Sequence, residues 1–157
     1  MSISGGTGSG LGVKLINRCR DEYPDRIMEV TSVFPSVSIS DSPVEPYNAV
    51  LSIHHLVENA DFVNVVQNQS LYEICGRSLR ITAPSFADFN YIIGLQMSDL
   101  SSSLRFAGSL NTNMRKTLVS IVPFPRLHFF GCSFAPLASI SNQTALDVSI
   151  IKRVLKF

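Results

Sequence analysis

The 157-residue sequence predicts an α/β fold, in which helices cover a parallel β-sheet. Two observations support this class. Short apolar segments typical of buried strands alternate along the chain with segments of helical periodicity, as the crossovers between parallel strands require. Hydrophobic residues make up 45% of the chain and charged residues only 16%, which is apolar enough for a sizeable core. The length suits one domain.

The first half of the chain predicts three helices and two strands. The proline of the segment "DEYPD" ends the first helix. The segment "PSVSISDSPVEP", residues 35–46, predicts a long loop of the kind that often carries functional residues. Asn68 stands where it could cap the third helix. The expected helices cover residues 8–21, 47–60 and 68–79, and the expected strands cover residues 26–34 and 61–67.

The second half begins with the longest periodic segment, which predicts one helix of about twenty residues between Pro84 and Phe106. A helix over 113–122, a strand over 126–137 and a helix over 145–157 follow. The last of these has an acidic residue near its start and basic residues near its end, which suits the helix dipole. The apolar stripe of the long helix is made of Phe86, Phe89, Ile92, Ile93, Gln96, Met97 and Leu100.

A glycine-rich stretch, "SGGTGSGLG" at residues 4–12, predicts a phosphate-binding loop. Glycine lets backbone amides approach an anion closely, and a helix that starts there adds its positive end. The spacing fits neither a Walker motif, because no lysine follows, nor G-x-G-x-x-G. A strand is expected before such a loop, whereas only Met1, Ser2 and Ile3 precede it.

Charge and hydropathy exclude several classes of partner. The formal net charge is +1. The chain therefore has no excess of basic residues that would attract nucleic acid and no acidic tail that would bind basic partners. No apolar run reaches the roughly 18 residues of a membrane span, and no signal peptide stands at the start. We therefore expect a cytoplasmic protein without nucleic-acid or membrane partners, whose apolar faces are covered by missing chain or by partner subunits.

The cysteines and histidines predict neither a metal site nor a catalytic base. The cysteines form no CxxC pair and lie far apart, so we expect free or buried thiols. The histidines lie in an apolar helical stretch and in an aromatic strand, without ligand spacing. These residues are Cys19, Cys75, Cys132, His54, His55 and His128.

Six separated segments resemble the tubulin family, and its β type in particular. They are the glycine-rich stretch, "EYPDRIM", "VEPYNA", "LVENAD", "LRF" and "VPFPRLHFF". The resemblance covers about residues 3–136. It implies part of the tubulin GTPase domain, which is Rossmann-like with a parallel sheet. The implied boundaries are 1–85 for the second half of the nucleotide-binding domain, 86–106 for the long core helix and 107–157 for the start of the intermediate domain.

The resemblance also implies which residues contact GTP. An amide side chain offers a donor and an acceptor to a purine edge, and an aromatic ring supplies about 1–3 kcal/mol of stacking per base. The aromatic ring is that of Phe86, which replaces a tyrosine of the family. The implied contacts are Ser2, Gly6, Thr7 and Gly8 for the phosphates, Asp41 and Glu45 for the ribose, Asn68 and Asn90 for the guanine edge, and Phe86 for stacking.

Each of these side chains also has a simpler interpretation when it is taken alone. Asn68 would be a helix cap, and Phe86 would be a core residue. Asp41 and Glu45 would be solvated loop residues. Only their joint placement in the family's order favours a nucleotide site.

The segment "LNTNMRK" bears on hydrolysis. In the family, an α chain presents a glutamate there to the nucleotide of the next subunit. Here Lys116 holds that position and Asn113 replaces an aspartate, and a lysine cannot orient or deprotonate water as a carboxylate could. The resemblance thus implies no catalytic residue in this chain. Arg115 and Lys116 are equally well interpreted as a solvated helix face.

The implied function is that of a β-tubulin-like, GTP-binding structural subunit of microtubules in the cytoplasm and cytoskeleton. Its implied partners are α tubulin and other tubulin subunits, with chaperones as further candidates. Mg²⁺ would accompany GTP, although the family's usual glutamate for it falls outside this sequence. Ser4 in place of a glycine, Pro43 and the short loop "ASISNQT" favour the alternative. In that alternative, the chain is a truncated interaction protein, or the product of a decaying gene, that binds no nucleotide.

Overall fold

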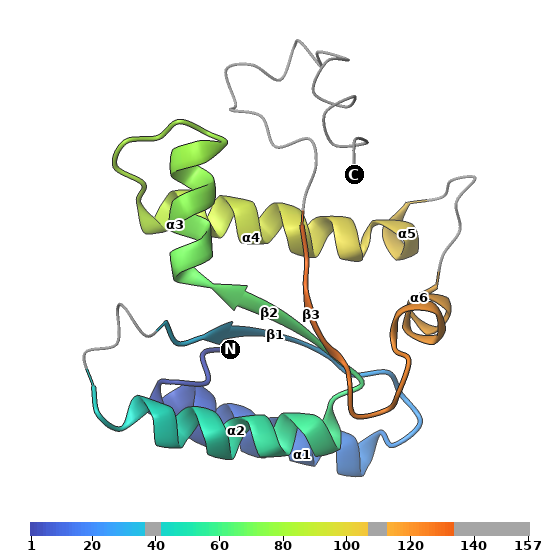
Figure 1. Ribbon diagram of the computed structural model, residues 1–157. Coiled ribbons are helices and arrows are strands. Elements are labelled where there is room, and N and C mark those ends of the chain that lie inside the picture. The colour runs from blue at the N-terminus through green and yellow to red at the C-terminus, as the bar shows by residue number, and fades with distance from the viewer. Residues whose placement is uncertain (37–41, 107–112, 134–157) are drawn as a thin grey trace.

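Helices pack on both faces of a small parallel sheet (Figure 1). The computed structural model describes residues 1–36, 42–106 and 113–133. Among these residues the sheet has the strand order β1-β2-β3, so the predicted α/β class with a parallel sheet is confirmed. The strands are β1 Glu29–Phe34, β2 Phe62–Gln67 and β3 Phe129–Gly131. The helices are η1 Thr7–Gly12, α1 Val13–Glu22, α2 Glu45–Asn59, α3 Asn68–Arg77, α4 Phe86–Leu100, α5 Ser102–Arg105 and α6 Met114–Ile121.

The three strands run parallel, and the start of the chain joins their sheet. Val63 of β2 is paired with Val30 of β1 on one side and with Phe129 of β3 on the other. On the outer edge of β1, Val33 N–H donates to Met1 O at 2.7 Å, and Ile3 N–H donates to Val33 O at 3.2 Å. The residues before the glycine-rich stretch therefore run parallel to β1, as the strand expected before a phosphate loop would.

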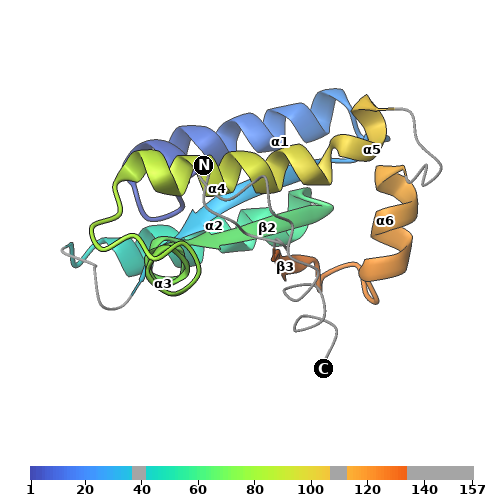
Figure 2. The same cartoon turned by 90° about the horizontal axis from the view of Figure 1, so that it is seen from above.

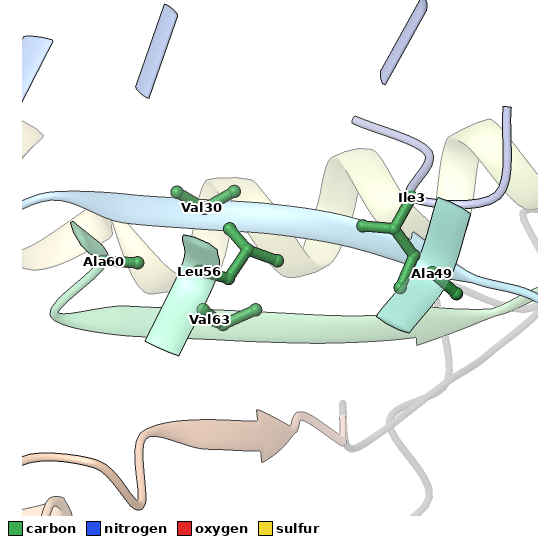
Figure 3. Close-up of a cluster of buried hydrophobic side chains, with 6 residues drawn as sticks. All are labelled: Ile3, Val30, Ala49, Leu56, Ala60 and Val63. Atoms are coloured by element: carbon green, nitrogen blue, oxygen red, sulfur yellow. The ribbon is translucent and has the colours of Figure 1, made fainter. Parts of the chain in front are cut away.

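One face of the sheet is covered by α1 and α2. Leu56 of α2 is fully buried against Val30 and Val63, which point to the same face of neighbouring strands (Figure 3). The cluster also contains Ile3, Ala49 and Ala60, and Ile16 of α1 packs at its margin. Alternate strand residues point to opposite faces, so a second apolar set is available to the other side.

The other face is covered by α3 and α4. Val66 of β2 packs there with Leu71 and Cys75 of α3 and with Phe89 and Ile92 of α4. Burial, with a smaller contribution from the nearby carboxylate of Asp88, raises the pKa of the Cys75 thiol. Burial on both faces explains why the strands are almost continuously apolar. All three cysteines are free, as predicted.

Side-chain hydrogen bonds to backbone carbonyls close the amino end of the sheet, where β1 and β2 begin. Arg20 of α1 donates to Asn59 O, at the end of α2, from Nη2 at 2.6 Å and from Nε at 2.8 Å. Its Nη2 also lies 2.8 Å from Asp61 Oδ2, which accepts from Met28 N–H at 2.8 Å. The guanidinium thus satisfies a carbonyl at the end of α2 and fixes α1 to the start of both strands.

Three sequence expectations about the helices were wrong. The long helix is interrupted at Ser101, which separates α4 from α5. The Ser101 hydroxyl donates to Met97 O at 2.9 Å, and such back-bonding weakens and often bends a helix. Two residues of its predicted apolar stripe, Phe86 and Met97, are exposed. Asn68 is the first residue of α3 and is not its cap, because the cap position is Gln67.

The third predicted strand is shorter than expected. β3 contains Phe129–Gly131, whereas the sequence predicts a strand over 126–137, of which 134–137 lie outside the described residues. The predicted terminal helix over 145–157 also lies outside them. Among the helices that the structure describes, none combines the length and the apolarity that crossing a membrane requires.

Candidate nucleotide-binding site

The predicted site residues lie mainly at the carboxyl end of the sheet. The arrowheads of β1 and β2 point to the same end of the molecule at which η1, α2 and α4 begin (Figure 1; the view from above in Figure 2 agrees). α3 starts directly after β2. Ligands of open parallel sheets bind at this end, because several helix N-termini and short loops converge there.

The glycine-rich stretch turns from the edge of β1 into a helix. Its first turns, η1, are wound as a π-helix that continues directly into α1. The first backbone hydrogen bond joins Ser9 N–H to Gly5 O at 3.0 Å. The amides of Gly6, Thr7 and Gly8 come earlier in the chain, so they stand among the donors at the open end of the helix. Such donors can bind an anion.

Gly8 is required by a close backbone contact. A Cβ atom added at Gly8 would lie 1.8 Å from the carbonyl oxygen of Ser2, which is far inside contact distance. In contrast, a Cβ atom added at Gly5 or Gly6 would have no heavy atom of the described residues within 4 Å. The loop is therefore packed tightly on the Ser2 side and open on the outer side, where a phosphate group has room.

A cavity of about 150 Å³ lies beside this loop. Glu45, in the first turn of α2, and Asn68, at the start of α3, both line it. A carboxylate in a first helical turn is favoured by the helix dipole. The full lining is Ser2, Ser4, Val33, Phe34, Pro35, Ser36, Glu45 and Asn68. Three of the predicted contacts, Ser2, Glu45 and Asn68, thus come together around one cavity.

Phe86 and Asn90 form a separate pair on α4. They are four residues apart on the helix, both are exposed, and neither lines the cavity. The Phe86 ring is 75% exposed and makes an edge contact with Phe89, with ring centroids 5.9 Å apart. α4 packs on α3, whose first residue is Asn68. Asp41, the remaining predicted contact, lies outside the described residues.

A capping box fixes the start of α4 immediately before Phe86. The Asp88 carboxylate accepts from Ser85 N–H at 2.7 Å and from Ser85 Oγ at 2.8 Å. These two hydrogen bonds hold the pKa of Asp88 below its ordinary value, and the bond from Ser85 N–H has the larger effect. The first turn of α4 is thus held by local contacts, which sets the direction in which the Phe86 ring leaves the helix.

The sequence analysis missed Asn48, which contacts the glycine-rich stretch. Its Nδ2 donates to Ser4 O at 3.1 Å, across 44 positions of sequence. Asn48 follows Glu45 by three residues on α2, so both side chains lie on the same side of the first turns of the helix. That spacing within "VEPYNA" is the signal that could have pointed to it.

Metal ligands are sparse in this part of the molecule. Within the described ranges, no group of three or more His, Cys, Asp or Glu side chains could hold a metal ion. Among the described residues that line the cavity, Glu45 is the single acidic one. Mg²⁺ at a nucleotide site is usually held by one or two carboxylates together with phosphate oxygens and water, so the described residues offer one candidate ligand, Glu45.

Comparison with known proteins agrees with the fold. Residues 1–76, which include η1, α1, β1, α2, β2 and nearly all of α3, match the Tubulin/FtsZ family, GTPase domain. The chain is 53% identical over 149 residues to the tubulin beta-6 chain of Gossypium hirsutum, and this alignment covers 95% of the chain and 33% of that relative. The chain thus spans about a third of the length of the curated relative it matches. With its parallel sheet and glycine-rich stretch, the chain belongs to the tubulin family, and it is β-tubulin-like.

Proposed function

We propose that the chain binds GTP at the carboxyl end of its sheet and serves as a β-tubulin-like structural subunit of microtubules, together with α tubulin and other tubulin subunits. The observation that carries this proposal is the cavity in which Ser2, Glu45 and Asn68 meet beside the glycine-rich stretch. The proposed locations are the cytoplasm and the cytoskeleton, and chaperones are proposed as additional partners during folding.

The loop residues would hold the phosphates. The amides of Gly6, Thr7 and Gly8 stand at the open end of η1, where the helix dipole favours negative charge. The family generally binds GTP with Mg²⁺, which neutralises phosphate charge. For this chain we propose the same pairing, in which Glu45, the acidic residue among the described cavity-lining residues, contributes through water.

The remaining contacts would read the nucleoside. Asn68 can donate to and accept from a guanine edge, and Glu45 can accept from ribose hydroxyl groups. The roles of Phe86 and Asn90 rest on the family resemblance and on their neighbouring, exposed positions on α4. The proposed role of Asp41 rests on the resemblance alone.

Hydrolysis in a neighbouring subunit is not part of the proposal. Lys116 is exposed on α6 and Asn113 precedes that helix, so the segment offers no carboxylate at the two positions that the family uses. A chain without such a carboxylate would not activate water for an adjacent nucleotide.

Equilibrium binding of labelled GTP to the purified chain tests the proposal. We expect a dissociation constant in the roughly micromolar range, competition by GDP and weak competition by ATP. Asn68→Ala should weaken GTP binding at least about tenfold, because the guanine edge would lose a hydrogen-bond partner and be left with an unpaired polar group. Asn59→Ala is the matched control, since that amide lies at the far end of α2 and bonds to Asn17. Absence of binding by a chain whose circular dichroism shows a folded α/β domain would refute the proposal.

One observation favours the alternative function of an interaction protein. A trough of about 930 Å³ runs beside β1 between α1 and α4, and Ile16, Val33, Ile93 and Met97 contribute to its apolar lining. Such an open apolar face is typical of a surface that another chain covers. Cross-linking with purified αβ-tubulin in the absence of nucleotide would test it, and cross-links at α1 or α4 together with no GTP binding would favour this alternative.

A further inference from the structure

The glycine-rich stretch is held from two sides, and Asn48 provides one of the two holds. At the Gly8 side, the backbone of the loop is packed against the carbonyl group of Ser2. At the entry side, the carbonyl oxygen of Ser4 accepts from Asn48 Nδ2 at 3.1 Å. Between these points Gly5, Gly6 and Thr7 are exposed, and glycine backbones lose more conformational freedom than any other when they are ordered.

Asn48 can act as a fixed support because α2 is firmly anchored. Its own carbonyl accepts from the buried Ser52 hydroxyl at 2.7 Å, and its N–H donates to Val44 O at 3.1 Å. The next residue, Ala49, and Leu56 two turns further on belong to the buried cluster on the sheet. The amide of Asn48 therefore starts from a rigid element, which is the arrangement that precise positioning of a loop needs.

We propose that Asn48 is a positioning residue for phosphate binding. It holds the entry of the glycine-rich stretch so that the amides of residues 6–8 are already oriented before the nucleotide arrives, and it ties this loop to the turn of α2 that carries Glu45. This inference rests on the proposed GTP binding and deepens it. Asn48 acts through the loop and does not itself contact the ligand, since its described bond goes to Ser4 O and it does not line the cavity.

The inference makes a prediction about which part of the nucleotide is affected. If Asn48 orders the phosphate loop, Asn48→Ala should lower the affinity for GTP and for GDP by roughly 3- to 10-fold, as expected for the loss of one hydrogen bond. Guanosine, which has no phosphate, should bind to Asn48→Ala and to the parent chain equally. A purely structural defect would lower the affinity for GTP, GDP and guanosine to the same degree.

Two further variants sharpen the measurement. Asn48→Asp keeps the shape of the side chain but removes the hydrogen-bond donor and places negative charge beside the loop. It should therefore lower the affinity for GTP more than Asn48→Ala does. Asn59→Ala removes a comparable interhelical amide bond, from Asn59 Nδ2 to Asn17 Oδ1 at 3.0 Å, at the other end of the same helix. That control should leave the affinity for all three ligands unchanged.

Amide hydrogen exchange of the nucleotide-free chain provides a second, independent test. Asn48→Ala should speed exchange at the Ser9 amide, which bonds to Gly5 O, and leave the amides of β2 unchanged. Unchanged exchange in the loop, or equal weakening of guanosine and GTP, would overturn the inference. If the parent chain binds no GTP, the proposed function fails, and hydrogen exchange alone still decides whether Asn48 holds the loop.

Discussion

The two ends of the sheet differ in how their backbone polar groups are used. At the amino end, carbonyl groups are satisfied by buried or half-buried side chains. Arg20 donates to Asn59 O, and the fully buried His128 has Nδ1 2.8 Å from Pro125 O and Nε2 3.2 Å from Leu56 O, so that the tautomer decides which of these two carbonyl groups accepts a hydrogen bond from the ring. At the carboxyl end, the residues that open η1 are exposed, and a cavity lies beside them at Ser2 and Ser4.

This difference has a physical meaning. Carbonyl groups at helix ends need donors, and the chain supplies those donors itself at the amino end. The exposed amides at the carboxyl end are open to water, and the proposed anionic ligand would accept from them in its place. One end therefore contributes to stability, and the other is the proposed binding site. The following variants separate the two contributions, from the largest expected effect to the smallest.

The largest effect is expected from Leu56→Ala, at the amino half of the core. The Leu56 side chain is fully buried against β1 and β2, so its truncation should lower the free energy of unfolding by about 2–5 kcal/mol. Leu51→Ala, on the exposed side of the same helix, is the control and should change it by less than about 0.5 kcal/mol. Urea denaturation of both variants gives the comparison, and similar midpoints would contradict this assignment of the core.

Gly8→Ala is the corresponding disruption at the carboxyl end. The added Cβ would meet the backbone oxygen of Ser2 at 1.8 Å, and a backbone atom cannot move aside without shifting the loop. We expect at least about tenfold weaker GTP binding and a loss of roughly 1–3 kcal/mol in stability. Gly10→Ala has open space around it and should bind GTP normally while gaining about 0.5–1 kcal/mol of helix stability. Equal GTP affinities for the two variants would show that the loop does not bind the phosphates.

Arg20→Met tests the closed end without disturbing the cavity. The variant keeps the apolar stem and removes the donors to Asn59 O and Asp61. Because the Asp61 side chain is 39% exposed, solvent weakens the ion pair, and we expect a loss of about 1–2 kcal/mol. GTP affinity, measured in the same preparation, should stay unchanged. A large loss of affinity would mean that the two ends are coupled.

The smallest effects are opposite pH dependences at the two ends. Burial raises the pKa of Glu29, at the amino end, so the folded state holds this proton more tightly and stability falls as the pH rises above about 4.5. Hydrogen bonds from Ser85 lower the pKa of Asp88, so its contribution is present above about 3.8 and is lost as the pH falls through the lowered value.

Melting curves across a pH series check both signs. Near neutral pH, Glu29→Gln should melt above the parent chain and Asp88→Asn should melt below it. Each difference should shrink in acid, as the carboxyl group of the parent becomes protonated. A constant offset at every pH would mean that the substitution acts through packing and not through the charge.

Much of the fold could be predicted because its signals are local. The apolar periodicity of α1, α2 and α3 and the short apolar runs of β1 and β2 are read within single segments. The glycine-rich stretch could likewise be recognised as a turn into a helix. Errors arose where a competing local bond or the absence of a distant contact decided the outcome, as at Ser101, whose hydroxyl donates to Met97 O where α4 gives way to α5, and at Phe86, which is exposed among the described residues.

The candidate site was predictable only in part, for the same reason. Ser2, Glu45 and Asn68 were expected from the family resemblance, and the fold places them around one cavity. Their roles toward GTP stay predictions, as do those of Gly6, Thr7, Gly8, Phe86 and Asn90. Asn48 was missed because its partner, Ser4 O, is a backbone atom 44 positions away, and backbone atoms carry no sequence signal.

The amino-acid sequence by itself determined the α/β class, the order of the elements, the family and the need for glycine near the start of the chain. Periodicity, turn chemistry and motif order are properties of neighbouring residues, so they survive without a three-dimensional structure. Only the tertiary structure decided that Gly8 is pressed against Ser2, that Asn48 holds the loop, and that Arg20 closes the opposite end. Those contacts join segments that meet only after the sheet has brought them together.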